Sequence, residues 1–459
     1  MKFNSAWTKG RAWTLATVLL GALFLPACQS VPKPEGPKKL KIAIPDDRAY
    51  SYRYQTFVDA KFPGWEISTV SMEDLKLFEH PLEAGQLLED FLKREKPDLV
   101  YMYSYVYPAV EGSLLRDLGE YAARDKWSLD AFEPAVIDQL KNNDEGKLFG
   151  LSPGFRSTAL FYNKTMFDRF GIERPHDRMT WSEVFASAAR FMQDKRMEKG
   201  SYGFSEALMT TPVNYLTTLS TTEGMRFYDA NTLKMTMQSE VWESIWNRVA
   251  TAYRQGAIGA IEYKPKTIDG NIVYTKDDME KINLFFQGKA AMTTGGDDLI
   301  QQLQSGHVPF EWGVVTGPVS ERDGNAVGWF TVDDVFSIPV VSEHPEEAWE
   351  VIRFLHSEDV GKVIASTDQG LSSLKNFTEW KNDPLYKPFY GVHSWPGALN
   401  SWSNPVPPAF LGPFYELLAK QMNDTISGKT TAKQALETLQ TKGQALMDSL
   451  PTEAAANAG

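Results

Sequence analysis

Strand patterns and helix patterns alternate through the first half of the chain, and this alternation restricts the fold more than any other feature. Apolar runs and period-two spacing predict strands over residues 40–44, 65–70 and 98–102. Helical spacing of apolar residues predicts helices over 54–62 and 87–92, between those strands. Strands that alternate with helices pair in parallel through right-handed crossovers. The sequence therefore predicts an α/β fold.

The same signals continue beyond this block. An apolar strand is predicted over 159–162, and Thr180 with Glu183 forms a capping box that begins a helix. Pro345 stands at the first position of another predicted helix, and the tail over 414–450 indicates two helices separated near Gly428. A chain of 459 residues is long enough for two domains.

Residues 1–28 have the layout of an export signal. A basic start precedes an apolar stretch over 12–25 and small residues before Cys28. The segment Leu-Pro-Ala-Cys resembles a lipobox, in which the cysteine thiol receives a diacylglyceryl group. The alternative is a buried thiol at the end of a core helix, which Pro26 and the proline-rich segment after Cys28 disfavour. We expect a lipid-attached Cys28, a tether over 29–39, and a lipoprotein on the outer face of the cytoplasmic membrane, extracellular in a single-membrane bacterium.

Cysteine count and charge exclude several classes of protein. Cys28 is the only cysteine, so the remaining chain has no disulfide, no cysteine nucleophile and no thiolate metal site. Its 42% hydrophobic and 12% aromatic content suits a globular protein stabilised by its core. A net charge of -12 disfavours nucleic acid as a partner, because phosphate binding needs clustered lysine and arginine.

Motifs for metal-dependent or phosphate chemistry are absent from the sequence. It contains no H-E-x-x-H and no P-loop, and His344 and His356 are too far apart for a helical ligand pair. The acidic pairs at 277–278 and 333–334 could bind calcium, although such pairs usually form turns or caps. We therefore expect a protein that is not an enzyme and has no cofactor and no metal.

Several segments appear in the order and spacing of one known family. Residues 150–183 contain Gly-Leu-Ser-Pro, Leu-Phe-Tyr-Asn-Lys, Phe-Asp-Arg-Phe-Gly-Ile-x-x-Pro and Thr-Trp-Ser-Glu in succession. Residues 286–292, Phe-Gln-Gly-Lys-Ala-Ala-Met, and residues 346–359 add two further segments. Together they resemble the extracellular solute-binding proteins of the maltose-binding class, the receptors of ABC importers. The resemblance extends from residue 40 to about residue 450.

This resemblance implies two discontinuous α/β lobes joined by hinge strands, a periplasmic-binding-protein-like fold of type II. The family's crossings map near residues 154–158, 328–332 and 373–378. The N-terminal lobe would then comprise residues 40–155 and 333–375, and the C-terminal lobe residues 156–332 and 376–459. A ligand that touches both lobes favours the closed form by its differential affinity for it.

Residues after the first and third strands are the first ligand candidates, because loops at the carboxyl ends of parallel strands face the ligand crevice. Asp46 and Asp47 could accept hydrogen bonds from sugar hydroxyls, while the alternative for Asp46 is a helix cap. Ser104 and Tyr105 follow the third strand beside Tyr103. Tyrosine offers a flat apolar face and a hydroxyl, and its alternative is core packing.

Four charged residues from later in the chain are further candidates. Arg156 lies on a predicted crossing, where a guanidinium can donate several hydrogen bonds; its alternative is a surface ion pair. Glu206 follows a predicted strand, with a solvated loop charge as its alternative. Asp297 and Asp298 follow two glycines that allow close backbone approach, and their alternative is a turn with a helix cap.

Trp329, Trp395 and Trp402 are the aromatic candidates for stacking on a sugar ring. Trp329 lies beside a predicted crossing, and the other two lie in the proline-rich stretch 386–414. The chain has 13 tryptophans, so core packing is the alternative for each of them.

The candidates favour a monomeric receptor that binds a mono- or oligosaccharide between its lobes and delivers it to ABC permease subunits. One alternative is a secreted carbohydrate-active hydrolase, because two carboxylates around a scissile bond would also line a cleft. Another is a lipoprotein of the same fold that acts as a sensor or an interaction protein without transport.

Overall fold

A computed structural model describes most of residues 37–450. Within that span the description omits residues 78, 81–82, 110–111, 142–145, 230–231, 262, 264–265, 269–270, 307, 368–369 and 397–407. Cys28 and Trp402, two predicted functional residues, lie outside the described residues. Within the described ranges, every helix is too short or too polar to cross a bilayer.

A four-stranded sheet of order β14-β3-β1-β2 forms the centre of the first lobe. β1 (Lys39–Ile44) pairs in parallel with β2 (Glu66–Ser71) and with β3 (Leu99–Tyr103), which confirms the predicted parallel arrangement. β14 (Asp334–Ser337) returns from far along the chain and pairs antiparallel with β3. The lobe is therefore made from two separate parts of the sequence.

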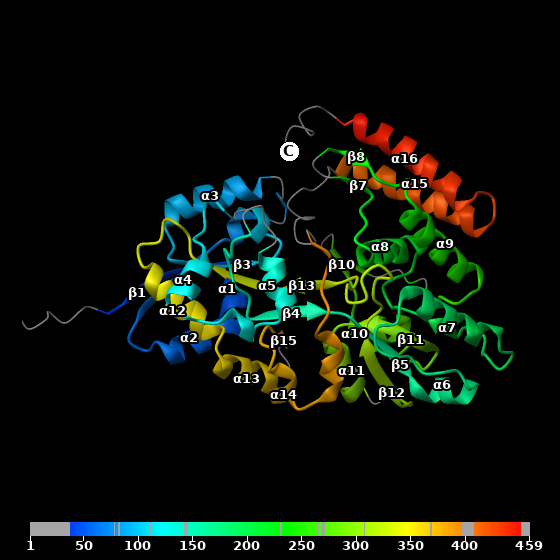
Figure 1. The fold of residues 1–459 in the computed structure, drawn as a ribbon, viewed down its shortest axis with the longest axis horizontal. Helices are drawn as coiled ribbons and strands as arrows, with labels where there is room; N and C mark the ends of the chain where they lie inside the picture. Colours follow the sequence, from blue (N-terminus) through cyan, green and yellow to red (C-terminus); the bar gives the residue numbers. More distant parts are fainter. Residues whose placement is uncertain are drawn as a thin grey trace, which may run out of the picture.

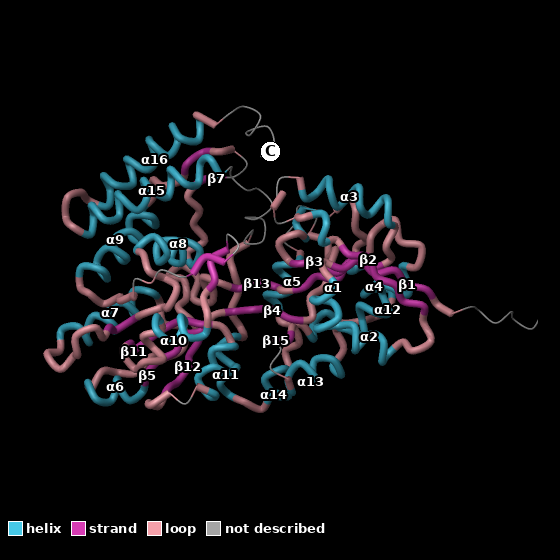
Figure 2. The backbone as a smooth tube through the Cα atoms, turned by 180° about the vertical axis from the view of Figure 1, so that it is seen from behind, coloured by secondary structure: helices cyan, strands magenta, loops and turns pink. Residues whose placement is uncertain are grey.

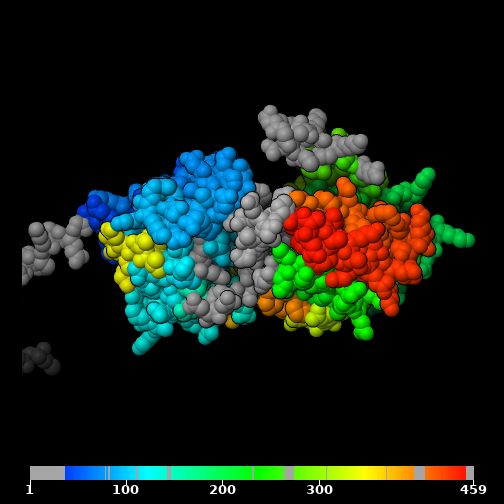
Figure 3. Space-filling view, turned by 90° about the horizontal axis from the view of Figure 1, so that it is seen from above, coloured from blue at the N-terminus to red at the C-terminus, as the bar shows by residue number. Residues whose placement is uncertain are grey.

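Helices from both parts of the sequence cover this sheet. α12 (Pro345–Leu355), with its proline at the first position as predicted, contacts α2 and β1 and lies among the early elements in Figures 1 and 3. The helix predicted over 54–62 begins earlier, because Asp46 caps it and a π-helical turn continues it. The other helical elements are α1 (Asp47–Tyr50), η1 (Ser51–Gln55), α2 (Thr56–Lys61), η2 (Glu73–Leu75), α3 (Ala84–Glu95), η3 (Tyr107–Ala109), α4 (Leu118–Arg124), η4 (Leu129–Ala131) and α5 (Pro134–Leu140).

The second lobe has its own four-stranded sheet, of order β12-β5-β11-β6. β5 (Ala159–Asn163) lies between β11 (Ala290–Gly295) and β12 (Trp312–Thr316), antiparallel to both, and β11 pairs in parallel with β6 (Tyr202–Phe204). Two small hairpins accompany it: β7 (Tyr228–Asp229) with β8 (Lys234–Met235), and β9 (Lys266–Ile268) with β10 (Asn271–Val273).

Helix caps in the second lobe form where the sequence predicts them. The Thr180 amide donates to the Glu183 carboxylate at 2.7 Å and the Glu183 amide donates to the Thr180 hydroxyl at 3.4 Å, which is the predicted capping box. Gly428, with φ of 74°, separates the last two helices. The helices are α6 (Lys164–Phe170), α7 (Trp181–Gln193), α8 (Pro212–Thr222), α9 (Glu240–Arg254), α10 (Lys276–Ile282), α11 (Asp298–Ser305), α15 (Pro408–Ile426) and α16 (Ala432–Asp448).

Three short strands lie between the lobes, and Figure 2 shows them side by side at the junction. β4 (Gly154–Ser157) is the central strand, with β13 (Phe330–Val332) and β15 (Leu371–Ser372) antiparallel on its two sides. Below them α13 (Glu358–Ser366) contacts α14 (Phe377–Lys381), while η5 (Pro384–Phe389) contacts β12. The chain after β15 thus touches both lobes, and the predicted lobe boundaries stay predictions.

The first-lobe core contains an uncharged histidine. His356 is almost fully buried, its ring lies 5.9 Å from Phe132 and 6.3 Å from Phe336, and its Nδ1 donates to the Ile352 carbonyl at 2.6 Å. Burial lowers its pKa to about 4. The unfolded chain therefore binds a proton at this histidine below about pH 6.5, the ordinary histidine pKa, whereas the folded protein binds it only as the pH approaches 4.

We predict that His356 makes the protein acid-labile. Because the folded pKa is depressed, the neutral imidazole contributes full stability above about pH 6.5 and loses it as pH falls toward 4, by about 3 kcal/mol in all. Urea unfolding of His356→Gln, which keeps a hydrogen-bond donor without a titration, should fall less steeply between pH 6.5 and 4.5 than that of the wild type. Parallel pH profiles for the two proteins would contradict the prediction.

Candidate ligand-binding site

Asp334, the first residue of β14, fixes the end of the hinge to the first lobe. Its buried carboxylate accepts hydrogen bonds from Arg53 Nη1 at 2.6 Å, the Tyr54 hydroxyl at 2.6 Å and the Tyr101 hydroxyl at 3.0 Å. Burial, together with this carboxylate, raises the pKa of Tyr101, so that it stays a donor. A buried charge is stable only when it is paired and hydrogen-bonded. The network therefore holds Asp334 opposite Tyr103 in the sheet.

Three first-lobe candidates gather at this edge of the sheet. The Tyr103 hydroxyl and the Ala49 amide each donate to the Asp46 carboxylate at 2.8 Å. The Tyr105 ring stacks on Tyr103 with centroids 5.9 Å apart, and Ser104 lies between them in the chain. Burial acts to raise the pKa of Asp46, but the hydrogen bonds outweigh it and the pKa is lowered. Asp46 therefore caps the helix that begins at Asp47, which is the alternative role that the sequence allowed, and its carboxylate stays ionised.

Arg156 and Asp333 form an ion pair on the hinge sheet. Arg156 Nε lies 2.7 Å from one carboxylate oxygen of Asp333 and 2.8 Å from the other. The Asp333 carbonyl accepts a hydrogen bond from the Ser104 amide at 3.0 Å, which joins this pair to the first-lobe candidates. Burial raises the pKa of Asp333, and Arg156 opposes that effect. Arg156 therefore forms an ion pair, the alternative that the sequence allowed, and this pair lies at the junction of the two lobes.

Asp297 approaches the same pair from the second lobe. It lies at the start of α11, is only 9% exposed, and no other described residue donates a hydrogen bond to its carboxylate. Burial raises its pKa to about 6; the hydrogen bond from its own backbone amide and the charge of Arg156 oppose the effect, while Asp298 and Asp333 add to it. A buried carboxylate with few donors costs stability, and strongly shifted pKa values cluster at functional sites.

Trp329 lies beside Gly296, the residue before Asp297, and is open to solvent. Its side chain is 47% exposed, which is unusual for an indole. A β-carbon at Gly296 would lie 3.9 Å from Cζ3 of Trp329, an ordinary van der Waals distance, so the ring borders the turn that carries Asp297. An exposed ring offers the flat apolar face, and a nearby carboxylate the hydrogen-bond acceptor, that a sugar ring needs.

Glu206 completes the second-lobe side of this group. Thr294, on β11, donates to the Glu206 carboxylate at 2.7 Å, and Thr294 is two residues from Gly296. Burial raises the pKa of Glu206 to about 7, while the threonine hydroxyl acts to lower it. The structure therefore brings together Asp46, Ser104, Tyr105, Arg156, Glu206, Asp297 and Trp329 along the junction of the two lobes.

Three predicted site residues do not belong to this group: Asp47, Asp298 and Trp395. Asp47 is exposed at the start of α1, and Asp298 accepts a hydrogen bond from the side chain one turn further along α11. The Trp395 indole donates to the Thr222 carbonyl at 2.7 Å, and the Arg322 guanidinium lies 5.0 Å from its ring centre. Trp395 therefore packs on the end of α8, and its role in binding stays a prediction.

Sequence reasoning missed Asp333 and Thr294 as members of this group. Asp333 was considered only as half of an acidic pair, although it follows a predicted crossing directly. In the acidic pairs considered for calcium, three carboxylates contact protein groups: Asp278 caps α10 with Thr275, and Asp333 and Asp334 bind arginines. No cluster of three or more metal-ligating side chains occurs among the described residues.

The expectation that the chain has no G-x-S-x-G motif is wrong: residues 150–154 have this pattern, which in other proteins marks a nucleophilic serine. Ser152 is fully buried and its hydroxyl donates to the Gly154 carbonyl at 2.6 Å. A nucleophile of that type must be exposed at a strand-to-helix turn, so Ser152 is a structural residue.

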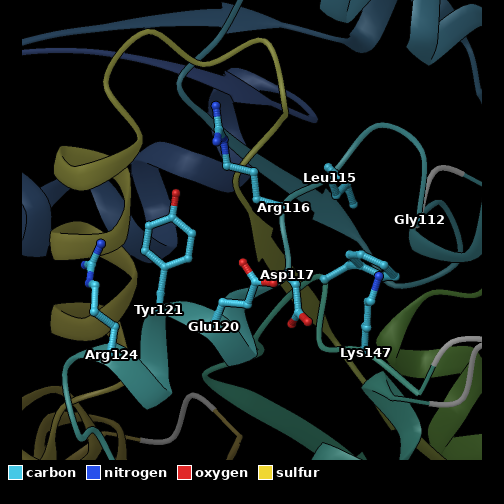
Figure 4. A pocket seen from close by; sticks show the side chains of 9 residues that line it. Gly112, Leu115, Arg116, Asp117, Glu120, Tyr121, Arg124 and Lys147 are labelled. Atoms are coloured by element: carbon cyan, nitrogen blue, oxygen red, sulfur yellow. The ribbon is translucent and has the colours of Figure 1, made fainter.

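A separate hollow of about 450 Å³ lies on the first lobe, away from the hinge (Figure 4). Its wall contains charged groups that are already engaged: Arg124 binds Glu346 at 2.7 and 2.8 Å, and Asp117 caps α4. It lies beside the loop that pairs with Pro339, beyond the far end of β14. The hollow contains none of the predicted ligand residues.

Two α/β lobes joined by three strands, with polar and aromatic side chains gathered at the junction, define a two-lobed binding protein. The chain belongs to the bacterial extracellular solute-binding protein family, whose model matches residues 75–362. This confirms the resemblance drawn from the sequence. Members of this family are binding proteins.

Individual relatives are distant. A binding protein of Brucella abortus is 25% identical over 305 residues, which cover 61% of this chain and 65% of that relative. The sugar-binding protein MalE of Xanthomonas citri has a TM-score of 0.63 and 16% identity, covering 90% of this chain and 98% of its own. A family 1 solute-binding protein of Alicyclobacillus acidocaldarius has a TM-score of 0.61 and 17% identity, covering 91% and 100%. These similarities establish the two-lobed fold.

We predict that Asp297 destabilises the ligand-free protein at neutral pH. Because its folded pKa is raised from 3.8 to about 6, the cost of the buried charge is absent below about pH 4 and complete above about pH 6. Asp297→Asn should therefore raise the free energy of unfolding by about 1–3 kcal/mol at pH 7.5, and the gain should disappear near pH 4. Urea unfolding at both pH values measures this.

Asp98 provides a matched control for that substitution. It is 4% exposed, but its carboxylate accepts hydrogen bonds from the Lys41, Glu343 and His344 amides and from the Ser342 hydroxyl. Asp98→Asn should lower stability at pH 7.5 by about 1–3 kcal/mol, because it removes charge-assisted bonds. If both variants lose stability, Asp297 is not an unsatisfied charge.

Proposed function

We propose that the protein is a receptor that binds a saccharide between its two lobes and delivers it to an ABC permease. The observation that carries the proposal is the exposed Trp329 beside Gly296, the residue before the buried Asp297, at a hinge where side chains of both lobes meet. Clefts between domains are favoured ligand sites, and a few aromatic and polar groups suffice to bind a small ligand with micromolar affinity, about -8.2 kcal/mol.

The similar structures support the ligand class. Cycloalternan is bound in the structure of one such protein from Listeria monocytogenes, maltotriose in one from Bdellovibrio bacteriovorus, and α-D-tagatose in one from Thermotoga lettingae. Indole rings stack on the apolar face of a pyranose, while carboxylates accept its hydroxyl hydrogens. Asp46, ionised and held by Tyr103, would supply a further acceptor from the first lobe.

Ligand binding would drive hinge closure. A ligand that contacts both lobes favours the closed form by the difference between its affinities for the two forms. The hinge strands are short, so a few residues at their ends can absorb the rotation. The closed form is the one that a permease would recognise, and reconstitution with a permease separates a transport receptor from a sensor of the same fold.

One observation favours a second candidate, a carbohydrate hydrolase. The pKa of Asp297 is raised to about 6 and that of Glu206 to about 7, values that suit a general acid. Our proposal is binding without turnover, and incubation of the protein with oligosaccharides followed by product analysis decides between the two.

We predict that a saccharide panel measured by thermal shift and calorimetry will contain a ligand, and that this ligand will shrink the radius of gyration in small-angle scattering. Trp329→Ala should weaken its binding about tenfold or more, since a stacked aromatic contributes roughly 1–3 kcal/mol. Trp329→Phe should retain most of the affinity, because it keeps a stacking face. Unchanged affinity in the alanine variant would remove Trp329 from the site.

We also propose that Cys28 carries a lipid anchor and that residues 29–39 act as a tether. Acylation contributes about 0.8 kcal/mol per buried methylene, so several chains hold a protein on a membrane. Labelled palmitate should be incorporated into the full-length protein expressed in a bacterium but not into Cys28→Ser, and the variant should leave the membrane fraction. Equal labelling of both proteins would refute the anchor.

A further inference from the structure

The hinge side of the candidate site carries more negative charge than positive charge. Four carboxylates from the two lobes and the strand junction lie here, and we call them the acidic wall of the site: Asp46, Glu206, Asp297 and Asp333. Asp47 and Asp298 lie next to two of them and are exposed.

Two arginines near this wall are already bound to carboxylates. Arg156 is paired with Asp333, and Arg53 is paired with the buried Asp334. Arg48 lies exposed on α1. The charged side chains that act most strongly on Asp297 are Asp298, the paired Arg156 and Asp333.

Asp297 is the carboxylate best placed to act on a ligand. The other three carboxylates each accept a hydrogen bond from another described residue: Asp46 from Tyr103 and Ala49, Glu206 from Thr294, and Asp333 from Arg156. Asp297 alone among these is nine-tenths buried with no donor from another described residue, and the exposed ring of Trp329 borders Gly296, the residue before it. A ligand that stacks on Trp329 would therefore lie beside the turn that carries Asp297.

We propose that this wall selects the ligand by charge, with Asp297 as the specificity-determining residue: the site takes uncharged or aminated saccharides and rejects those that carry a carboxylate or a phosphate. The inference rests on the proposed saccharide receptor and narrows its substrate class. Hydroxyl and ammonium groups donate hydrogen bonds to a carboxylate, whereas an ionised acid group can only accept them. Two like charges a few ångströms apart in a partly desolvated cleft repel strongly.

A first experiment measures the charge of the wall without any ligand. In a Cys28→Ser background, Trp329→Cys supplies a single thiol, and its reaction rates with a cationic and an anionic methanethiosulfonate are compared. Val363→Cys, at an exposed position on α13, is the reference. The ratio of cationic to anionic rate should be about ten times higher at position 329, and adding Asp297→Asn should lower it. Equal ratios at the two positions would overturn the inference whatever the ligand is.

A second experiment measures selection directly by calorimetry with maltotriose, cellotriose, the β-1,4-linked glucosamine trimer and the β-1,4-linked glucuronic acid trimer. The acidic trimer should bind at least about 30-fold more weakly than cellotriose, and Asp297→Asn should reduce this gap to about fivefold or less. Glu437→Gln, which removes an exposed carboxylate from α16, should leave the gap unchanged.

The outcomes separate the two claims. Binding of the acidic trimer as tight as that of its neutral counterpart overturns charge selection and leaves the saccharide receptor standing. If Asp297→Asn leaves the difference in affinity between the acidic and neutral trimers unchanged, Asp297 does not cause that difference, and its assignment as the specificity-determining residue is overturned. Failure of all four trimers to bind contradicts a trisaccharide ligand, and the thiol reaction rates at position 329 then decide the charge inference by themselves.

Discussion

The peptide that joins β13 to β14 is the constraint on which the rest of the molecule depends. Successive side chains of an extended chain point to opposite faces, so Asp333 and Asp334 serve different parts of the structure. Asp334 turns into the first lobe, where an arginine pairs with it and two tyrosine hydroxyls donate hydrogen bonds to it, and Asp333 turns onto the hinge sheet toward Arg156. One dipeptide therefore anchors the hinge and contributes a carboxylate to the candidate site.

Buried carboxylates in this chain fall into two groups, and the difference separates scaffold from site. Asp98 and Asp334 are surrounded by donors and hold distant segments together. Asp297 and Glu206 have too few donors for their burial, which raises the pKa of each. Local rules of this kind are broken chiefly at functional sites. The raised pKa values of these two residues are therefore what favours them as candidates for the ligand site.

Local features of the fold could be predicted from the sequence, while non-local ones could not. Apolar periodicity located β1, β2 and β3, and the Thr180–Glu183 box and Pro345 located two helix starts, since these signals act within a few residues. The pairing of β14 with β3 brings together segments that no local pattern connects. For the same reason Asp333 was missed, because its partner Arg156 lies on another crossing strand. The position of Trp395 could not be predicted either, because it depends on a hydrogen bond to a carbonyl at the end of α8.

The split composition of the first lobe has a consequence for how the protein is made. During synthesis β3 emerges long before β14, and until β14 arrives β3 presents an unpaired edge with buried apolar residues. Contacts between segments so distant in sequence form slowly. The nascent chain therefore stays without a finished first lobe until most of its length has been translated, a state suited to threading through a narrow translocation channel before folding on the far side.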